Sequence, residues 1–225
     1  QTALELAVPV ASWRAVGHSH QGFFVEGFLD EVAAVSKTDP YQFRLRLLRN
    51  HPRAASVLTT AAKMAQWQTA PTPTKDGRPV ARGIALHASF GTIAAHVAEV
   101  SISNDGKIRV HRIVVVADCG FVVNPDGARQ QLESATLYGL TAALYGEITI
   151  VNGAVQQSNF DTYKPLRMDE SPVLEVHLVQ SAEPPSGLGE PGLPSVAPAV
   201  ANAIFALTGT RLRSLPLRLL TVAAT

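Results

Sequence analysis

The hydrophobic pattern of the chain changes character near residue 70. Before that point, apolar side chains recur every three or four positions, which is typical of amphipathic helices. From residue 83 onward, Val and Ile become frequent and partly alternate with polar residues, which favours strands. Prolines and glycines cluster between the two regions. The sequence therefore predicts a helical segment over 1–70, a linker or loop over 71–82 and a mixed segment over 83–225.

Three helices are predicted in the first segment. Ser19 is a candidate N-cap for a helix that runs to about residue 37, with Phe23 and Phe28 on its apolar face and Glu26 and Asp30 among its polar positions.

The other two helices are predicted over 41–50 and 53–67, because His51-Pro52 breaks the pattern between them. In the 41–50 helix, we expect Phe43, Leu47 and Leu48 to face inward. The solvent-exposed face is expected to hold Arg44, Arg46 and Arg49.

The second segment is predicted to combine hairpin strands with two helices. Strands over 83–103 and 108–117 flank Asn104-Asp105-Gly106-Lys107, which is a strong hairpin signal. Because strands and helices do not alternate regularly, the pattern favours an α+β fold of mixed sheets with packed helices over a doubly wound parallel sheet. The remaining predicted elements are helices over 126–145 and 195–207 and strands over 147–151, 154–157 and 173–179.

Composition excludes several classes of protein. The formal net charge is +1 and 16% of the residues are charged, without the clustered basic side chains that a nucleic-acid surface needs. No apolar run approaches the roughly 18 residues of a membrane span. The single cysteine, Cys119, excludes an internal disulfide and an iron–sulfur cluster built by this chain alone.

One stretch, over 186–194, is more tightly specified than the rest. Gly187 and Gly189 permit positive φ and close approach of the backbone to a ligand, while Pro191 limits how the loop can bend. Glu190 would sit on this stiff loop beside the apolar helix predicted over 195–207. A carboxylate next to a low-dielectric core can serve as a general base near neutral pH. From spacing alone, a solvated glutamate on a structural turn is the alternative.

Four separated segments together resemble one family. They are Trp13-Arg14-Ala15-Val16-Gly17-His18-Ser19-His20 with the helix that follows; Asp118-Cys119-Gly120, Asn124-Pro125 and Gln131-Leu132-Glu133; Thr162-Tyr163-Lys164; and Gly187-Leu188-Gly189-Glu190-Pro191. In this order, they resemble the molybdenum-binding subunits of the xanthine dehydrogenase and aldehyde oxidase family, of the isoquinoline 1-oxidoreductase beta-subunit type. The resemblance implies the molybdopterin-binding portion of a molybdenum hydroxylase.

The resemblance assigns a catalytic role to Glu190. In that family, the glutamate of the Gly-x-Gly-Glu loop takes the proton from the molybdenum-bound hydroxyl as its oxygen attacks an electron-poor carbon. Metal coordination makes such a hydroxyl acidic, so a nearby carboxylate can act as its general base. The implied reaction is the oxidation of an N-heterocycle or an aldehyde with oxygen from water.

Further site residues follow from the same match. The cofactor-binding candidates are Arg14, Gln131, Gly187, Leu188 and Gly189. Trp13 and Val16 are expected to line the substrate pocket. For Arg14, a solvated side chain is the alternative, and for Gln131, a cap or surface residue. Tyr163 and Lys164 either order the approach to the pocket or simply pack together.

The resemblance also implies cofactors and partners. The cofactor is a molybdenum–pterin, expected as molybdopterin cytosine dinucleotide and shared with another chain, and the metal takes no protein side chain as ligand. The family's [2Fe–2S] clusters would reside in a small partner subunit, with a cytochrome or another electron acceptor beyond it. Because the family's Gly-Gln-Gly and Gly-Gly-Phe-Gly loops are absent, we expect the carboxy-terminal part of a catalytic unit, either a natural separate subunit or one fragment of a split polypeptide. Its face towards the missing portion should be apolar, so we expect the chain to aggregate or stay partly unfolded when produced alone. The sequence does not distinguish the cytoplasm from the periplasm.

Three other interpretations remain. The chain could be a non-catalytic assembly subunit with the same fold. A hydrolase using Glu190 with Asp169 or Glu170 has no matching motif. A zinc site at His18 and His20, with His51 or His87, lacks a third ligand at a suitable interval.

Overall fold

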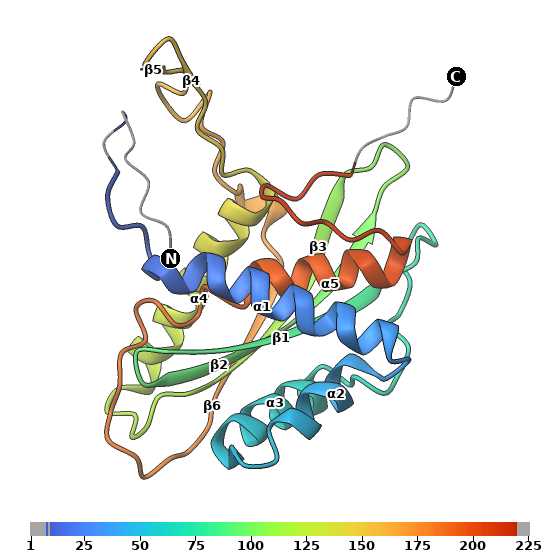
Figure 1. Ribbon diagram of the computed structural model, residues 1–225, viewed down its shortest axis with the longest axis vertical. Helices are drawn as coiled ribbons and strands as arrows, with labels where there is room; N and C mark the ends of the chain where they lie inside the picture. The colour runs from blue at the N-terminus through green and yellow to red at the C-terminus, as the bar shows by residue number, and fades with distance from the viewer. Residues whose placement is uncertain (1–7, 9, 220–225) are drawn as a thin grey trace.

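The computed structural model describes residue 8 and residues 10–219, and it places helices before and after a sheet (Figure 1). The helices of the first part are α1 (Val16–Val35), α2 (Pro40–Leu47) and α3 (Pro52–Met64). The later elements are β1 (Ala81–Ser89), β2 (Thr92–Ile102), β3 (Ile108–Asp118), α4 (Pro125–Leu144), β4 (Ile150–Val151), β5 (Ala154–Val155), the 3-10 helix η1 (Met168–Glu170), β6 (Val173–Leu178) and α5 (Val196–Thr208). The predicted α+β architecture is confirmed.

The main sheet has the strand order β1-β2-β3-β6. The first three strands form antiparallel hairpins, and β6 returns parallel to β3 after the chain has passed through α4. Helix α5 packs on β1 and β2, with α1 beside it, whereas α3 packs on β2 and β3. Figure 1 shows α1 and α5 running side by side, and the β4–β5 hairpin projecting away from the sheet. The result is a sheet with helices on both faces.

Strand β2 explains why the sequence pattern alternates only in part. Ala94 and Ala98 lie in the apolar cluster with α5, whereas Ala95 and Val97 lie in the cluster with α3. Both faces of the strand are buried, so apolar residues occur at consecutive positions.

Helix α5 lies unusually close to the sheet. A Cβ atom on Gly83 of β1 would lie 2.1 Å from the Ala199 carbonyl oxygen, so only glycine allows this approach. Asn202 on α5 donates a side-chain hydrogen bond to the Ile84 carbonyl, at 3.1 Å. The alanine-rich composition of α5 therefore allows close backbone packing, which fixes where the loop before α5 ends.

One predicted strand, over 83–103, is two strands. Phe90 and Gly91 have φ values of 52° and 80° and connect β1 to β2 in a tight turn. Positive φ at both central residues is the geometry of a type I′ hairpin turn. The turn is missed in the sequence because Phe-Gly lacks the Asn-Gly or Asp-Gly signature that marks such turns. The predicted turns at Asn104–Lys107 and Asn152-Gly153 are present.

The burial of α1 and α2 differs from the prediction at several positions, although Phe23 is buried and Arg46 and Arg49 are exposed as expected. Arg44, expected in solvent, is 2% exposed, and its Nε lies 2.7 Å from Glu26 Oε2. Asp30 is also buried, and it pairs with Arg211 at 2.6 Å. Phe28, expected inside, is 65% exposed. The pattern failed because these charges satisfy one another, which makes their burial possible.

Two further details differ from the sequence-based expectation. Leu47, expected to face inward on α2, is exposed. Helix α1 begins at Val16, so Ser19 is not its N-cap and instead donates to the Val16 carbonyl at 2.7 Å. The division into segments 1–70, 71–82 and 83–225 stays a prediction, and its ends fall partly outside the described residues. Among those residues, no helix has both the length and the apolar character needed to cross a bilayer.

Candidate active site

The loop over 186–194 is anchored at its start by the turn between β1 and β2. Thr92 donates through Oγ1 to the Gly187 carbonyl at 2.7 Å, and the two hydroxyls of Thr92 and Ser186 are also 2.7 Å apart. The backbone N–H of Ser186 donates to the Cys119 carbonyl at 2.8 Å. The loop therefore leaves the sheet in a fixed direction, set by the ends of two strands.

Its other anchor comes from the residues just before α1. Arg14 donates through Nε to the Gly189 carbonyl at 2.6 Å and through Nη1 to Ser134 Oγ at 3.1 Å. The backbone N–H of Ala15 donates to Glu190 Oε1 at 3.0 Å. Segments separated by 175 residues thus meet at the predicted catalytic carboxylate.

The backbone at this junction adopts an uncommon conformation. Ala15 has φ 70° and Val16 has φ 41°, values that are unfavourable for a residue with a Cβ and more so for a β-branched one. Ala15 is completely buried, and the Val16 N–H is held by the Trp13 carbonyl at 2.8 Å. Strained backbone of this kind persists only where the surroundings hold it, and it collects at functional sites.

Helix α4 contributes one face to the same region. Gln131, Ser134 and Tyr138 follow one another at intervals of three and four residues and so lie on one side of the helix. Trp13 stacks on Tyr138 with ring centroids 5.2 Å apart, and the Arg14 guanidinium lies 5.6 Å from the Tyr138 centroid. Sequence reasoning missed Ser134 and Tyr138, although their helical spacing from Gln131 was a usable signal.

The loop presents unused polar groups to open space. Apart from their chain neighbours, no atom of the described residues lies within 4 Å of a Cβ built on Gly187, and for Gly189 only the Gln131 side-chain oxygen does, at 3.9 Å. Within the described part of the chain, the N–H groups of residues 187–189 and Glu190 Oε2 make no hydrogen bond. Gln131 is itself exposed. Amide donors and an amide side chain suit the hydrogen-bonding edges and phosphate of a pterin cofactor, so the donor set fits such a group.

Tyr163, Lys164 and Glu170 lie elsewhere. Lys164 Nζ is 3.2 Å from Glu170 Oε1, which also accepts from Tyr145 Oη at 2.7 Å. Tyr145 follows α4, and 14 residues of helix, about 21 Å, separate it from Gln131.

The environment of Glu170 does not suit a general base. Burial alone would raise the pKa of Glu170, but hydrogen bonds from Tyr145, the Arg167 N–H and Lys164 outweigh it and lower the pKa to about 2. Glu170 is therefore a poor proton acceptor and stands too far from the loop to act with Glu190.

The histidines form a pair rather than a metal cluster. His18 Nδ1 and His87 Nε2 are 3.0 Å apart, while His20 turns away and packs near Phe24 with centroids 5.8 Å apart. In the portion described by the structure, no three His, Cys, Asp or Glu side chains come together as a metal site. Cys119 is buried, which raises the pKa of its thiol, and it holds the loop through its carbonyl instead.

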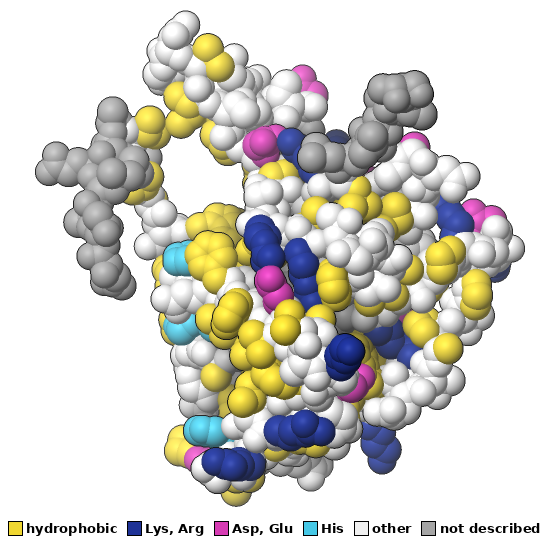
Figure 2. All heavy atoms as spheres, turned by 45° about the vertical axis from the view of Figure 1, so that its right-hand side comes forward, with side chains coloured by type: hydrophobic (Ala, Val, Ile, Leu, Met, Phe, Trp, Pro, Cys, Tyr) yellow, Lys and Arg dark blue, Asp and Glu magenta, His cyan; other side chains and the backbone are white. Residues whose placement is uncertain are grey.

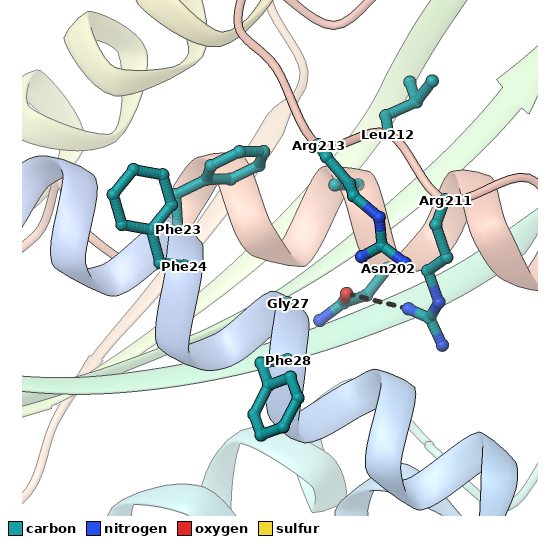
Figure 3. A pocket seen from close by; sticks show the side chains of 9 residues that line it. Phe23, Phe24, Gly27, Phe28, Asn202, Arg211, Leu212 and Arg213 are labelled. Carbon is teal, nitrogen blue, oxygen red and sulfur yellow. Dashed lines mark hydrogen bonds between the residues drawn. The ribbon is translucent and has the colours of Figure 1, made fainter.

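A separate groove of about 240 Å³ lies between α1 and α5. Phe23, Phe24 and Phe28 approach it from α1, opposite Arg211 and Arg213 (Figure 3). Figure 2 shows this face of the molecule, where apolar side chains surround a few paired basic and acidic ones. Both arginines are committed to acids of α1, Arg211 to Asp30 and Arg213 to Glu31, so the groove offers mainly apolar surface.

Comparison with known proteins identifies relatives across the chain. Residues 32–172 match the sequence family described as the molybdopterin cofactor-binding domain. The beta chain of isoquinoline 1-oxidoreductase from Brevundimonas diminuta is 34% identical over 94% of this chain, and a nicotinate dehydrogenase chain of Pseudomonas putida is 33% identical over 92%. A protein of Gluconacetobacter polyoxogenes, named membrane-bound aldehyde dehydrogenase [pyrroloquinoline-quinone], is 36% identical over 91%.

The matched region is a fraction of these relatives. The chain spans 28%, 27% and 19% of the lengths of the Gluconacetobacter, Brevundimonas and Pseudomonas proteins. Among solved structures, quinoline 2-oxidoreductase from Pseudomonas putida 86 superimposes on 56% of this chain and 17% of its own, with a TM-score of 0.52 at 21% identity. This likeness concerns the fold alone.

Proposed function

Because this chain belongs to the molybdopterin cofactor-binding family of the xanthine dehydrogenase and aldehyde oxidase enzymes, we propose that it supplies the proton-accepting wall of a molybdenum hydroxylase active site, with Glu190 as general base. The observation that carries the proposal is the junction of Ala15 with Glu190. One carboxylate oxygen is held by a backbone N–H at 3.0 Å, and the other makes no hydrogen bond to the described residues. A carboxylate fixed at one oxygen and open at the other is oriented for proton transfer.

The cofactor is proposed to be a molybdenum–pterin, in the cytosine dinucleotide form. When bound, it supplies a metal-centred two-electron oxidation with oxygen drawn from water. The N–H groups of Gly187, Leu188 and Gly189 and the Gln131 amide are the groups of this chain that would hold it. Arg14 has both hydrogen bonds directed at Gly189 and Ser134, so its role is to hold the loop in place.

The name of one relative points to a different cofactor. The Gluconacetobacter protein is named for pyrroloquinoline quinone, whereas the family matched by residues 32–172 is defined by molybdopterin. We assign molybdopterin to this chain on the family match and on the open amide donors of the loop. Metal analysis together with pterin fluorescence of the purified complex tests this assignment directly. Quinone without molybdenum would overturn it.

The catalytic role is tested by Glu190→Gln in the assembled enzyme. The substitution keeps a hydrogen-bond acceptor for the Ala15 N–H but removes the base, so kcat should fall by about 10²- to 10⁴-fold while molybdenum and pterin contents persist. Glu133→Gln is the matched control, because Glu133 is a surface glutamate on α4 that pairs with Arg129. Retained turnover in Glu190→Gln would support a non-catalytic assembly subunit instead.

The remainder of the catalytic unit is proposed to cover α1. Phe24, Phe28 and Val35 are exposed, and their spacing of four and seven residues places them along one stripe of the helix. This chain spans about a quarter of the length of two matched relatives, which leaves a large polypeptide to cover the stripe. A stripe of this kind suits docking of an apolar surface.

The docking proposal is tested by Phe28→Cys in the complete enzyme. Phe28 is 65% exposed on the surface of this chain, so a thiol reagent should label the introduced thiol slowly only if another polypeptide covers it. Phe160→Cys, in the exposed turn that follows the β4–β5 hairpin, gives the reference rate. Equal labelling of the two introduced thiols would show that the stripe is not an interface.

The other partners and the substrate follow from the family. Since this chain has a single cysteine, the [2Fe–2S] clusters are assigned to a small partner subunit that passes electrons to a cytochrome or another acceptor. The substrate is proposed to be an N-heterocycle or an aldehyde, the classes named in the relatives. Trp13 and Val16 stand at the junction beside Glu190 and are proposed to line its pocket.

A further inference from the structure

We propose that His18 and His87 form a paired-imidazole recognition site beside Glu190, in which His18 Nε2 hydrogen-bonds the ring nitrogen of a planar aromatic substrate. The inference rests on the proposed function for the location of the substrate, and it selects N-heterocycles from the two proposed classes. Three observations support the inference: the location of the two histidines, the hydrogen bond between their rings, and the packing of Phe90 against His18.

The two histidines come from the two segments that anchor the catalytic loop. His18 is on the first turn of α1, three residues after Ala15. Its backbone N–H donates to the Ala15 carbonyl at 2.9 Å. Helical side chains lean toward the N-terminus of their helix, so His18 lies over the turn that holds Glu190. His87 is near the end of β1, whose turn is bound to Gly187 through Thr92.

The hydrogen bond between the rings limits their protonation, because one of the two ring nitrogens must donate and the other must accept. His18 Nδ1 and His87 Nε2 are 3.0 Å apart, so one proton lies between them and both rings cannot carry a full charge. When His87 Nε2 is the donor, His18 Nδ1 is the acceptor and the proton of His18 is on Nε2. That N–H can then donate to a ligand. Hydrogen bonds in such a chain polarise one another, so the terminal donor is strengthened.

The surroundings favour a neutral aromatic ligand. Burial lowers the pKa of His87 to about 4, with the adjacent His18 adding to the effect, so His87 is uncharged at neutral pH. Phe90 packs edge-on to His18 with centroids 5.0 Å apart and is partly exposed. Among the described residues, no charged side chain is hydrogen-bonded to either ring of the pair. An apolar ring edge beside one neutral donor suits a flat ring bearing a single acceptor nitrogen.

The experiment compares two ligands that differ by one atom. Isoquinoline, a bicyclic aromatic with one ring nitrogen, and naphthalene, its counterpart without nitrogen, are titrated calorimetrically into the complete enzyme carrying Glu190→Gln, at a pH of about 8, where His87 is neutral. The Glu190→Gln background prevents turnover. We expect isoquinoline to bind about three- to tenfold more tightly than naphthalene, as one net hydrogen bond allows. His18→Phe should abolish that preference while retaining the binding of naphthalene.

Further variants keep the test decisive. His18→Gln retains an amide donor and should preserve part of the preference, and it substitutes for His18→Phe if that variant fails to fold. His20→Phe is the control, because His20 lies outside the pair, and the preference should be unchanged. An equal affinity for both ligands in the parent enzyme, or an unchanged preference in His18→Phe, would overturn the inference. If the enzyme with native Glu190 contained no molybdenum and showed no turnover while the His18-dependent preference was present, the catalytic proposal alone would be overturned.

Discussion

The backbone N–H of Ala15 and the carboxylate of Glu190 are joined by a hydrogen bond of 3.0 Å across 175 residues of sequence. The neighbouring residues repeat the connection, since Arg14 binds the carbonyl of Gly189. The position of the proposed base is therefore determined by the segment before α1 as much as by its own loop. A change before α1 should be detectable in the chemistry at Glu190.

Arg14→Gln is expected to reduce kcat while cofactor content and the melting temperature change little. The loss of both guanidinium bonds frees the Gly189 carbonyl and lets Glu190 move, and a displacement of about 1 Å can cost about a hundredfold in rate. Steady-state kinetics with molybdenum analysis measure the effect. Arg129→Gln, on the exposed face of α4, is the control and should behave like the parent. Loss of molybdenum in Arg14→Gln would indicate a direct contact with the cofactor instead.

Gly83→Ala is expected to destabilise the protein by more than about 3 kcal/mol, because the new methyl group would overlap the backbone of α5 at Ala199 and Ala203. Gly27→Ala is the matched substitution, since no atom lies within 4 Å of its Cβ position in α1, and it should stabilise by about 0.5–1 kcal/mol. Urea unfolding of the purified protein compares the two. Equal stabilities would mean that α5 does not lie against β1.

Arg44→Met is expected to cost about 3–5 kcal/mol, because it leaves Glu26 buried without its partner. Burial already raises the pKa of Glu26, and Arg44 opposes that rise. The double variant Glu26→Gln with Arg44→Met should recover much of the loss. The surface pair of Arg218 with Glu147 gives the control, and Arg218→Met should cost less than about 1 kcal/mol. The free energy of unfolding of each variant is measured by urea unfolding. Similar losses in Arg44→Met and Arg218→Met would contradict the burial of the Arg44–Glu26 pair.

This ion pair also marks where sequence reasoning failed. Periodicity located α1 and α2 within a few residues. It nevertheless predicted an exposed Arg44 and a buried Phe28, whereas Arg44 is buried and Phe28 is exposed. A periodic pattern ranks positions by polarity and contains no information on which charge meets which. The pairing of α1 with α2 is a tertiary contact, and it decides the burial of both helices.

The candidate site was predictable to a different degree. The loop around Glu190 was recognisable because it concentrates glycines, which permit unusual backbone conformations, and prolines, which restrict them. The role of Ala15 was not recognisable, since it acts through a contact made only after folding. The turn at Phe90-Gly91 was missed for a further reason, because φ of 52° at a phenylalanine is imposed by its neighbours.

His96 predicts the dependence of stability on pH. Burial lowers the pKa of His96 from 6.5 to about 3, and the ring is held by Ser195 and Thr136 at 2.8 and 3.1 Å. Between these pH values the unfolded chain binds a proton that the folded protein does not. The free energy of unfolding should therefore be highest above pH 6.5 and fall as the pH decreases toward 3.

The slope through His96 should approach about 1.4 kcal/mol per pH unit. Urea unfolding in a series of buffers measures it, with His96→Gln as the variant that removes the titrating group. A residual slope is expected in His96→Gln, because the pKa of His87 is also lowered, to about 4. An unchanged slope would mean that His96 is protonated in the folded state.

The separation of Ala15 and Glu190 by 175 residues has a consequence for the order of events during synthesis. The strands β1, β2 and β3 are joined by short turns and can pair while the ribosome is still at work, because local contacts form quickly. The anchor at Arg14 and Ala15 emerges early and must wait for the loop at 186–194 to leave the ribosomal tunnel. The junction around Glu190 can therefore form only after translation has passed residue 194.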